Sequence, residues 1–541
     1  MAREPSLYPV QRDPPPNPRS AQDVPGRASG AGDAPSEAPI VLEGHGVTLG
    51  DVVRVARGGV AVALGPKARE RMRAARETVD RLARSDEAIY GLTTALGANT
   101  GRAIPAGELA AYQERAVLAR AVGVGPRFAT DAVRAIMFAR LSGMAVGGSG
   151  VSPAVFDALL AMLNAGVHPV VPSKGSIGVA DLAPLSHMAL PLLAEGEAEY
   201  RGEILPAAEA LARAGLAPVA LAAKDGLALI SSNAASVGCA ALALHDATAA
   251  LDALNVAAAL AFEGFRANLS PLDPRVQAAR PSPGQREIAA RLTALLEGSG
   301  LWSRGAARRV QDPVSFRCVT QVHGAALAAA MSAREQIELE LNSAADSPLV
   351  LPESGEMLSN GNFHVAGLSL AFDALAIGLA QAAAISVERC LKLFSPAFSD
   401  LPLQLTRHGP LHSGFATVQK TLTALYNEIR HAANPASLDF LPVSEAVEDH
   451  APMTPHAIAK SVVIADNVRY LAAIELLAAA QAVDLRGVDP GTLGRGAKAA
   501  YEAVRRVVPT LEGDRPIGPD IETIERLVAV GAIGNRGIGV R

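Results

Sequence analysis

The sequence predicts a mainly α-helical protein, and two observations carry that prediction. Of the 541 residues, 49% are apolar but only 4% are aromatic. Ala, Leu and Val supply most of the apolar content, which favours helices packed through small side chains over a sheet rich in aromatic and β-branched residues. The second observation is a set of long, Ala- and Leu-rich stretches that almost lack proline: residues 234–263, 319–344, 365–393 and 455–484.

Several of these stretches are apolar around much of the helical circumference, as is typical of helices buried inside a bundle or between subunits. Polar clusters lie in the loops that join them. Because binding residues concentrate on loops held by a rigid scaffold, we expect function in these loops. They are residues 311–317, 345–348, 359–364 and 434–453.

The chain before the long helices has a different character, because glycine and proline interrupt its segments. We predict an N-terminal domain at residues 41–221, built around irregular turns and carrying Tyr90 and the 175–185 turn, and a long-helix bundle domain at 222–541. Residues 1–40 contain Pro14-Pro15-Pro16 and few apolar side chains. They cannot bury enough surface to offset their ordering entropy, so we predict a disordered, proline-rich tail.

Charge and cysteine usage exclude several function classes. A net charge of −5, spread along the chain, gives no basic surface for nucleic acid. Charges such as Asp373 and Glu388 interrupt the apolar helices, and no signal peptide is present, so we expect a cytoplasmic protein that does not enter a membrane. The three cysteines show neither disulfide nor zinc spacing, and they are Cys239, Cys318 and Cys390.

Several short strings, in order along roughly residues 40–540, resemble the aromatic amino-acid (histidine, phenylalanine and tyrosine) ammonia-lyase family. The resemblance implies a mainly α fold with long helices, a small amino or carboxylic acid as ligand, and a homotetramer in which three subunits share each active site. The strings are Tyr90-Gly91-Leu92-Thr93-Thr94 continuing to Gly101, Arg140 to Val151, Pro172 to Gly178, Asp181 to His187, Gln311-Asp312-Pro313, Ser315-Phe316-Arg317-Cys318, Glu340-Leu341-Asn342, Asp346-Ser347-Pro348, Gly361-Asn362-Phe363-His364, Pro435-Ala436-Ser437 and Glu448-Asp449-His450.

One turn departs from that family. Its members build an electrophilic methylidene-imidazolone from an Ala-Ser-Gly triad, in which the serine loses water to give a methylene. Here the turn reads Gly178-Val179-Ala180-Asp181, one residue shorter and without Ser, Thr or Cys. Ser176 is near, but Ile177 follows it. We therefore expect a divergent member that lacks the prosthetic group and uses no other cofactor.

The resemblance also implies roles for individual residues. Tyr90 corresponds to the general base that removes the β-proton, and Glu428 corresponds to a glutamate near the amine. Arg317 corresponds to the carboxylate clamp, for which a two-pronged guanidinium suits better than lysine. Asn362 and Gln311 are weaker candidates for substrate contacts.

Three further positions differ from the family pattern. Val314 replaces a tyrosine expected near the substrate, and Ser231 replaces an asparagine that supports an oxyanion, with Asn233 two residues on. The dipeptide that selects the substrate is Ala119-Arg120. If Arg120 faces the pocket, it favours a substrate with a second anionic group.

Other polar motifs point to structure rather than chemistry. His187, His364 and His450 have no metal-ligand spacing, so we interpret them as structural and predict no metal site. The Gly147-Gly148-Ser149-Gly150 run lacks the lysine of a phosphate-binding loop and is interpreted as a turn.

The residues support two functional interpretations. The chain is a lyase for a histidine-like or other aromatic α-amino acid, or a related carboxylic acid with a better leaving group or a more acidic proton. Alternatively, it is a non-catalytic ligand-binding or regulatory homologue that kept the fold, since fold does not guarantee activity. The helical fumarase/aspartase fold is set aside because its Gly-Ser-Ser-x-Met-Pro-x-Lys signature is absent.

Overall fold

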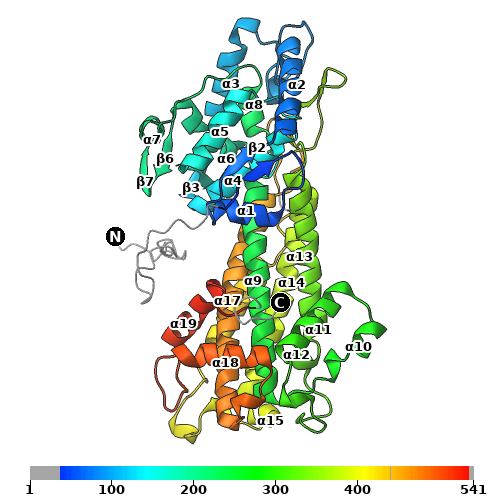
Figure 1. The fold of residues 1–541 in the computed structure, drawn as a ribbon, viewed down its shortest axis with the longest axis vertical. Helices are drawn as coiled ribbons and strands as arrows, with labels where there is room; N and C mark the ends of the chain where they lie inside the picture. Colours follow the sequence, from blue (N-terminus) through cyan, green and yellow to red (C-terminus); the bar gives the residue numbers. More distant parts are fainter. Residues whose placement is uncertain (1–36, 439, 535–541) are drawn as a thin grey trace, which may run out of the picture. The chain divides into compact units, whose positions relative to one another are not determined.

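The computed structural model describes residues 37–438 and 440–534 (Figure 1). Contacts divide the chain into two units, Met1–Ala38 and Pro39–Arg541. The second unit contains all the helices and strands described below. Most of the predicted tail, residues 1–36, lies outside the described residues.

Four long helices form the centre of this unit, as the composition predicts. Figure 1 shows them running side by side, and α9 packs against α17, α13 and α14. Their bounds differ from the predicted ones by at most three residues at either end. They are α9 (Ala234–Phe265), α13 (Val319–Leu341), α14 (Ala366–Phe394) and α17 (Thr454–Arg486), and the shorter α16 (Val418–Ala432) packs on α14 and α17.

Small side chains allow these helices to approach closely, and one buried ion pair joins two of them. Ala257, Ala258 and Ala259 on α9 are fully buried. Arg389 of α14 donates to Glu475 of α17 through Nε at 2.5 Å and Nη2 at 2.9 Å, and both side chains are 0% exposed. Removing one partner of such a pair would leave a buried charge uncompensated.

Two apolar stretches are long enough to cross a membrane by length and composition, so charges do not interrupt every apolar helix as we expected. For Asp225–Phe265, 94% of the apolar window is buried within the chain, as in a core helix. For α14 the share is 56%, and the exposed side chains of Leu370 and Ile377 lie two turns apart on that helix.

The chain before α9 combines short helices with small sheets, and the strands were not predicted. β1 pairs with β2, β3 with β5, and β6 with both β4 and β7. Helices α1 and α4 pack on α9 and connect this part to the bundle. The elements are β1 (Ile40–Leu42), α1 (Leu49–Ala56), β2 (Val62–Leu64), α2 (Pro66–Leu82), α3 (Leu109–Leu118), β3 (Val124–Arg127), α4 (Thr130–Ala145), α5 (Pro153–Ala165), β4 (Val167–Pro169), β5 (Pro172–Lys174), α6 (Leu182–Ala189), β6 (Glu197–Tyr200), β7 (Glu203–Pro206), α7 (Ala207–Arg213) and α8 (Asp225–Ile230).

Shorter elements surround the bundle. Cys239, Cys318 and Cys390 form no disulfide with one another. The remaining elements named in Figure 1 or used below are α10 (Pro274–Ala279), α11 (Pro283–Leu295), η5 (Gly300–Trp302), α12 (Val314–Arg317), β8 (Leu349–Leu351), β9 (Glu356–Leu358), α15 (Pro396–Ser399), α18 (Arg495–Val507) and α19 (Gly518–Ala529).

Candidate active site

The altered turn joins β5 to α6 and is closed by its own hydrogen bonds. The Ser176 hydroxyl donates to Asp181 Oδ1 at 2.7 Å and accepts from the Gly178 amide at 3.1 Å. Gly178 and Ala180 both have positive φ, at 82° and 57°. Ala180 is therefore one of the few non-glycine residues held in the left-handed region, where an L side chain is strained.

Asp181 fixes the turn to the start of α9. Its carboxylate accepts from the Ser236 amide at 2.6 Å and from the Ser236 hydroxyl at 3.0 Å, in addition to the Ser176 hydroxyl. The side chain is 0% exposed. Burial raises the pKa of this carboxyl above its usual value, although the hydrogen bonds from both serines oppose the shift.

The opposite side of the turn packs against the beginning of α17. The Met453 amide donates to the Ile177 carbonyl at 3.0 Å. A Cβ atom on Gly178 would lie 3.0 Å from the Thr454 amide nitrogen and 3.2 Å from ring atoms of Pro452 and Pro455. Glycine is required here both for its backbone conformation and for this close approach.

The residues of this turn do not fit a methylidene-imidazolone. Val179 and Ala180 have no β-leaving group, so neither can lose water to give the methylene. The one nearby hydroxyl, on Ser176, is held by Asp181 and Gly178 and lies outside the tripeptide that would have to cyclise.

Tyr90 lies in a half-buried loop of the same region. Its hydroxyl accepts from the Gly97 amide at 3.2 Å, and the residue packs against a small apolar cluster formed by Leu96, Ala116 and Leu227. Gln113 of α3, which no sequence motif singled out, connects these parts. It donates to the Gly91 carbonyl at 3.3 Å and accepts from the Leu227 amide at 2.9 Å.

Arg120 and Ser231 lie on elements that pack in this region, because α3 and α6 both contact α8. Arg120 follows α3, is half-buried, and donates to the Ala116 carbonyl at 3.0 Å. Ser231 ends α8 and is buried. Asn233 is 1% exposed, and neither of its side-chain polar atoms has a hydrogen-bond partner within the described chain.

Two of the histidines assigned to structure lie together beside the altered turn. His364 forms an isolated backbone bridge with Val179. Its Nε2 lies 2.9 Å from His450 Nδ1, within hydrogen-bond distance. Burial, together with the neighbouring His450, lowers the pKa of His364. Asn362 in the same loop is exposed and donates to the Ala344 carbonyl at 3.4 Å. His187 accepts from the Gly123 amide at 3.1 Å, which is a structural role.

Arg317 and Gln311 lie at the other end of the bundle. Arg389 of α14 donates to the Ser315 carbonyl at 3.3 Å, and Arg389 is 23 residues along α14 from its first residue, Ala366. At 1.5 Å per residue, Arg317 is about 35 Å from His364 in the same chain. With the Gln311 amide oxygen turned toward the guanidinium, it accepts from Arg317 Nη1 at 2.7 Å.

Val314 and the altered turn, which both depart from the family pattern, lie at opposite ends of the bundle in one chain. Val314 is 54% exposed on α12, far from the turn. Arg317 Nε is buried without a hydrogen-bond partner in the described chain. A site that uses both Tyr90 and Arg317 therefore has to be built from more than one chain.

Glu428 is also separated from the turn. This exposed residue of α16 accepts from Asn467 Nδ2 of α17 at 3.0 Å. Asn467 lies 13 residues after Thr454, where α17 begins beside the turn. That places Glu428 about 20 Å from the turn in one chain.

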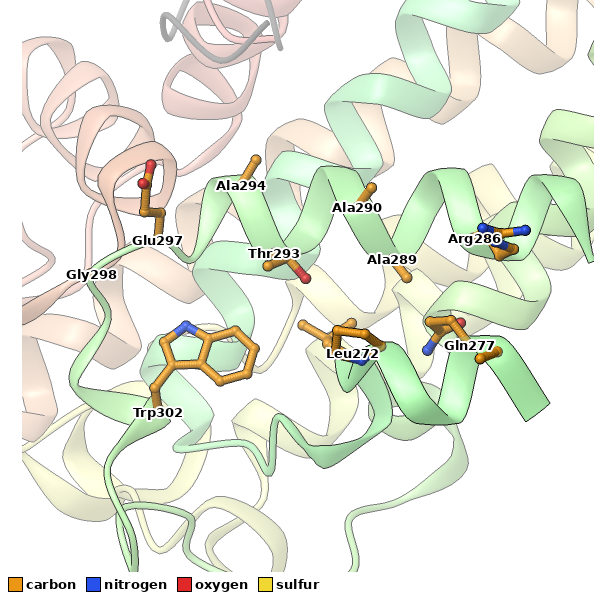
Figure 2. A pocket seen from close by; sticks show the side chains of 12 residues that line it. Leu272, Gln277, Arg286, Ala289, Ala290, Thr293, Ala294, Glu297, Gly298 and Trp302 are labelled. Atoms are coloured by element: carbon orange, nitrogen blue, oxygen red, sulfur yellow. The ribbon is translucent and has the colours of Figure 1, made fainter. Parts of the chain in front are cut away.

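A cavity of about 700 Å³ lies elsewhere, between α11 and the two segments that flank it, which run from Leu272 to Ala278 and from Glu297 to Trp302 (Figure 2). Figure 2 shows Arg286 on α11 and Glu297 just beyond the end of this helix, at opposite ends of the lining. None of the predicted site residues lines it. Within the described residues, no group of three His, Cys, Asp or Glu side chains could hold a metal ion.

The profile of one protein family, described as aromatic amino acid lyase, matches residues 47–506. The chain belongs to this family. The resemblance of its ordered motifs is thereby confirmed.

Individual lyases and aminomutases are similar over nearly the whole chain. The histidine ammonia-lyase of Gloeobacter violaceus is 43% identical over 495 residues, which is 91% of this chain and 96% of that protein. The histidine ammonia-lyase of Symbiobacterium thermophilum is 42% identical, with the same coverage of each chain.

Solved structures agree with the fold. The ergothioneine-degrading enzyme of Treponema denticola, in complex with desmethyl-ergothioneine sulfonic acid, superposes with a TM-score of 0.89 at 33% identity, covering 92% of this chain and 99% of that one. The tyrosine aminomutase of Streptomyces globisporus gives 0.87 at 34% identity, covering 93% and 98%. The mainly helical ammonia-lyase fold is therefore established for this chain.

Proposed function

We propose that this chain is a cytoplasmic lyase that acts on a histidine-like or other aromatic α-amino acid, or a related carboxylic acid, without a methylidene-imidazolone. The observation that carries the proposal is the closed turn at Gly178–Asp181. It offers no leaving group for forming the electrophile, yet its hydrogen bonds and packing are complete.

Without an electrophile to activate the amine, the substrate itself has to supply a good leaving group. A quaternary ammonium group does so. A base takes the proton from Cβ, the Cβ–H electrons form the carbon–carbon double bond, and the C–N electrons leave with nitrogen as a neutral tertiary amine. No proton has to reach the leaving group, and charge is conserved.

The retained residues supply the remaining roles in this proposal. Tyr90 is the base, and Arg317 from a second subunit holds the carboxylate, with Gln311 and Asn362 as further contacts. Glu428 of another subunit lies near the cationic group. Arg120, half-buried after α3, gives a preference for a substrate with a second anionic group.

We propose a homotetramer with shared sites, in which Tyr90, Arg317 and Glu428 of different subunits come together although they lie far apart in one chain. The exposed apolar side chains of α14 support that assembly, since Leu370 is 60% and Ile377 is 44% exposed in the single chain.

Intact mass and a substrate comparison test the proposal. We expect the purified chain to have its full sequence mass. A loss of two waters localised to residues 175–182 would contradict the absence of the prosthetic group. Histidine, Nα-trimethylhistidine and ergothioneine are then compared for release of the amine. We expect turnover of a trimethylated compound and little turnover of histidine.

The alternative is a non-catalytic homologue that binds a small acid. Val314 and Ser231, which replace residues expected to act on the substrate, favour it. Tyr90→Phe decides between the two. A lyase loses turnover, whereas a binding protein retains its ligand affinity and has no turnover to lose.

A further inference from the structure

Three aromatic rings form a continuous group beside the altered turn. The His364 and His450 ring centroids lie 5.0 Å apart with planes tilted by 30°. The Phe440 and His450 centroids lie 5.2 Å apart with a tilt of 54°. The three residues come from two loops that are far apart in sequence, and we refer to them as the ring cluster.

Backbone contacts fix the ring cluster next to the turn. The bridge between His364 and Val179 joins one side of it. On the other side, His450 is three residues before Met453, whose amide donates to the Ile177 carbonyl. The ring cluster therefore adjoins the position at which an electrophile would meet the substrate amine in an ordinary member of the family.

The electrostatics of the ring cluster suit a cation. One proton between His364 Nε2 and His450 Nδ1 requires one of these nitrogens to act as acceptor, so the pair is not doubly protonated. Burial lowers the pKa of His364 and so favours its neutral ring. Neutral rings present negative π faces. Glu448 and Asp449 directly precede His450 and add negative charge to the same loop.

From this geometry we infer that the ring cluster is the subsite for the substrate's cationic nitrogen, with a preference for a quaternary over a primary ammonium group. A primary ammonium needs hydrogen-bond acceptors to replace its water. A trimethylammonium group has no N–H and spreads its charge over methyl groups, which contact aromatic faces. This inference rests on the proposed function and specifies the part of the substrate that the altered turn selects.

Graded fluorination of Phe440 tests the subsite. Adding one, two and three fluorines to this ring weakens its π face with little change in size. The full-length assembly is titrated by calorimetry with Nα-trimethylhistidine and with histidine. We expect the affinity for the trimethylated compound to fall stepwise, by about tenfold at the third fluorine, and the affinity for histidine to change less than about twofold.

Phe398 provides a matched control, because its half-buried ring contacts Lys392 and Arg309 outside the ring cluster. The same fluorination there should leave both affinities unchanged. Equal weakening of both ligands by fluorinated Phe440, or no weakening of either, would overturn the inference.

Binding and turnover separate the two proposals. If the fluorination series lowers affinity but no amine is released from any substrate, the subsite stands and the lyase proposal fails. If amine is released but neither its rate nor KM changes when Phe440 is fluorinated, the lyase proposal is supported and the subsite inference fails. His450→Phe provides a second check, since it keeps an aromatic face and should retain affinity, whereas His450→Ala should reduce it.

Discussion

The two ends of the helical bundle differ in how one chain holds the residues that we assign to the site, although each end has buried polar atoms without partners in the described chain, such as those of Asn233 near the turn. At the turn end, the backbone and carboxylate of the Gly178–Asp181 turn have partners within the chain, and Gly178 packs against the start of α17. At the other end, Arg317 Nε and Ser315 Oγ are buried without hydrogen-bond partners in the described chain.

We use this difference to distinguish residues that stabilise the fold from residues that take part in the reaction. A polar group buried without a partner is costly, so its retention calls for an explanation in terms of binding. We therefore expect substitutions within the Gly178–Asp181 turn to affect mainly folding, and substitutions of Tyr90 or near Arg317 to affect mainly the reaction.

The largest expected effect tests whether Tyr90 of one subunit and Arg317 of another subunit form one active site. Arg317→Ala should lower kcat/KM for the trimethylated substrate by about 100-fold or more, because it removes a charge-assisted clamp. Tyr90→Phe should cause a loss of at least similar size. When the two variants are co-expressed, each should supply the residue that the other lacks, and a measurable fraction of activity should return. Inactive mixed assemblies would show that one chain provides both groups.

A second prediction concerns the tight packing of the turn. Gly178→Ala should lower the free energy of unfolding by about 2 kcal/mol, since it adds backbone strain and a contact with Thr454. Gly202→Ala is the matched control, with φ at +84° and no atom within 4 Å of the added Cβ. It should cost about 1 kcal/mol. Equal losses in urea unfolding would mean that the packing around Gly178 is loose.

A third prediction uses the pH dependence of Asp181. Its pKa is raised in the folded state, so the folded protein binds this proton more tightly than the unfolded chain does. The cost of the buried charge is present above the folded pKa and disappears as the pH falls through it toward the unfolded value. Asp181→Asn should cost about 1 kcal/mol at neutral pH through poorer hydrogen bonds.

The measurement is urea unfolding of both proteins across the acidic range. The stability difference should shift further in favour of the wild type as the pH falls. A shift in the opposite direction would show that the hydrogen bonds from Ser176 and Ser236 outweigh burial.

The smallest effect is expected for the stability of Arg317→Ala. Since Nε has no partner within the described chain and the nearby Gln311 is exposed, the unfolding free energy should change by no more than about 0.5 kcal/mol. Differential scanning calorimetry of the variant at matched oligomeric state measures it. A large loss would make this end of the bundle structural and remove the contrast between the two ends.

Much of the fold could be predicted from sequence because it depends on local patterns. The Ala- and Leu-rich stretches, which almost lack proline, locate α9 and α17 to within a few residues. The altered turn was recognised because it is one residue shorter than the family's motif and lacks the serine of that motif. Short strands such as β6 were missed, because their pairing with β4 depends on residues about 30 positions away.

The candidate site was less accessible to sequence reasoning. His364 and His450 are 86 residues apart, and their spacing in the sequence does not predict that they are in contact. Their juxtaposition follows from how two loops pack on the turn. The separation of Arg317 from Tyr90 follows from the length of α14, which no motif encodes.

The closed turn also has an evolutionary consequence. Regaining the Ala-Ser-Gly triad would require an insertion between Gly178 and Asp181. Gly178 packs closely against Thr454, and Asp181 accepts a hydrogen bond from the Ser236 amide. A longer turn would therefore have to displace the contacts that join α6, α9 and α17. Single-step reversion would therefore pass through a destabilised intermediate, which would hold a chain with this turn to chemistry without the prosthetic group, as we propose.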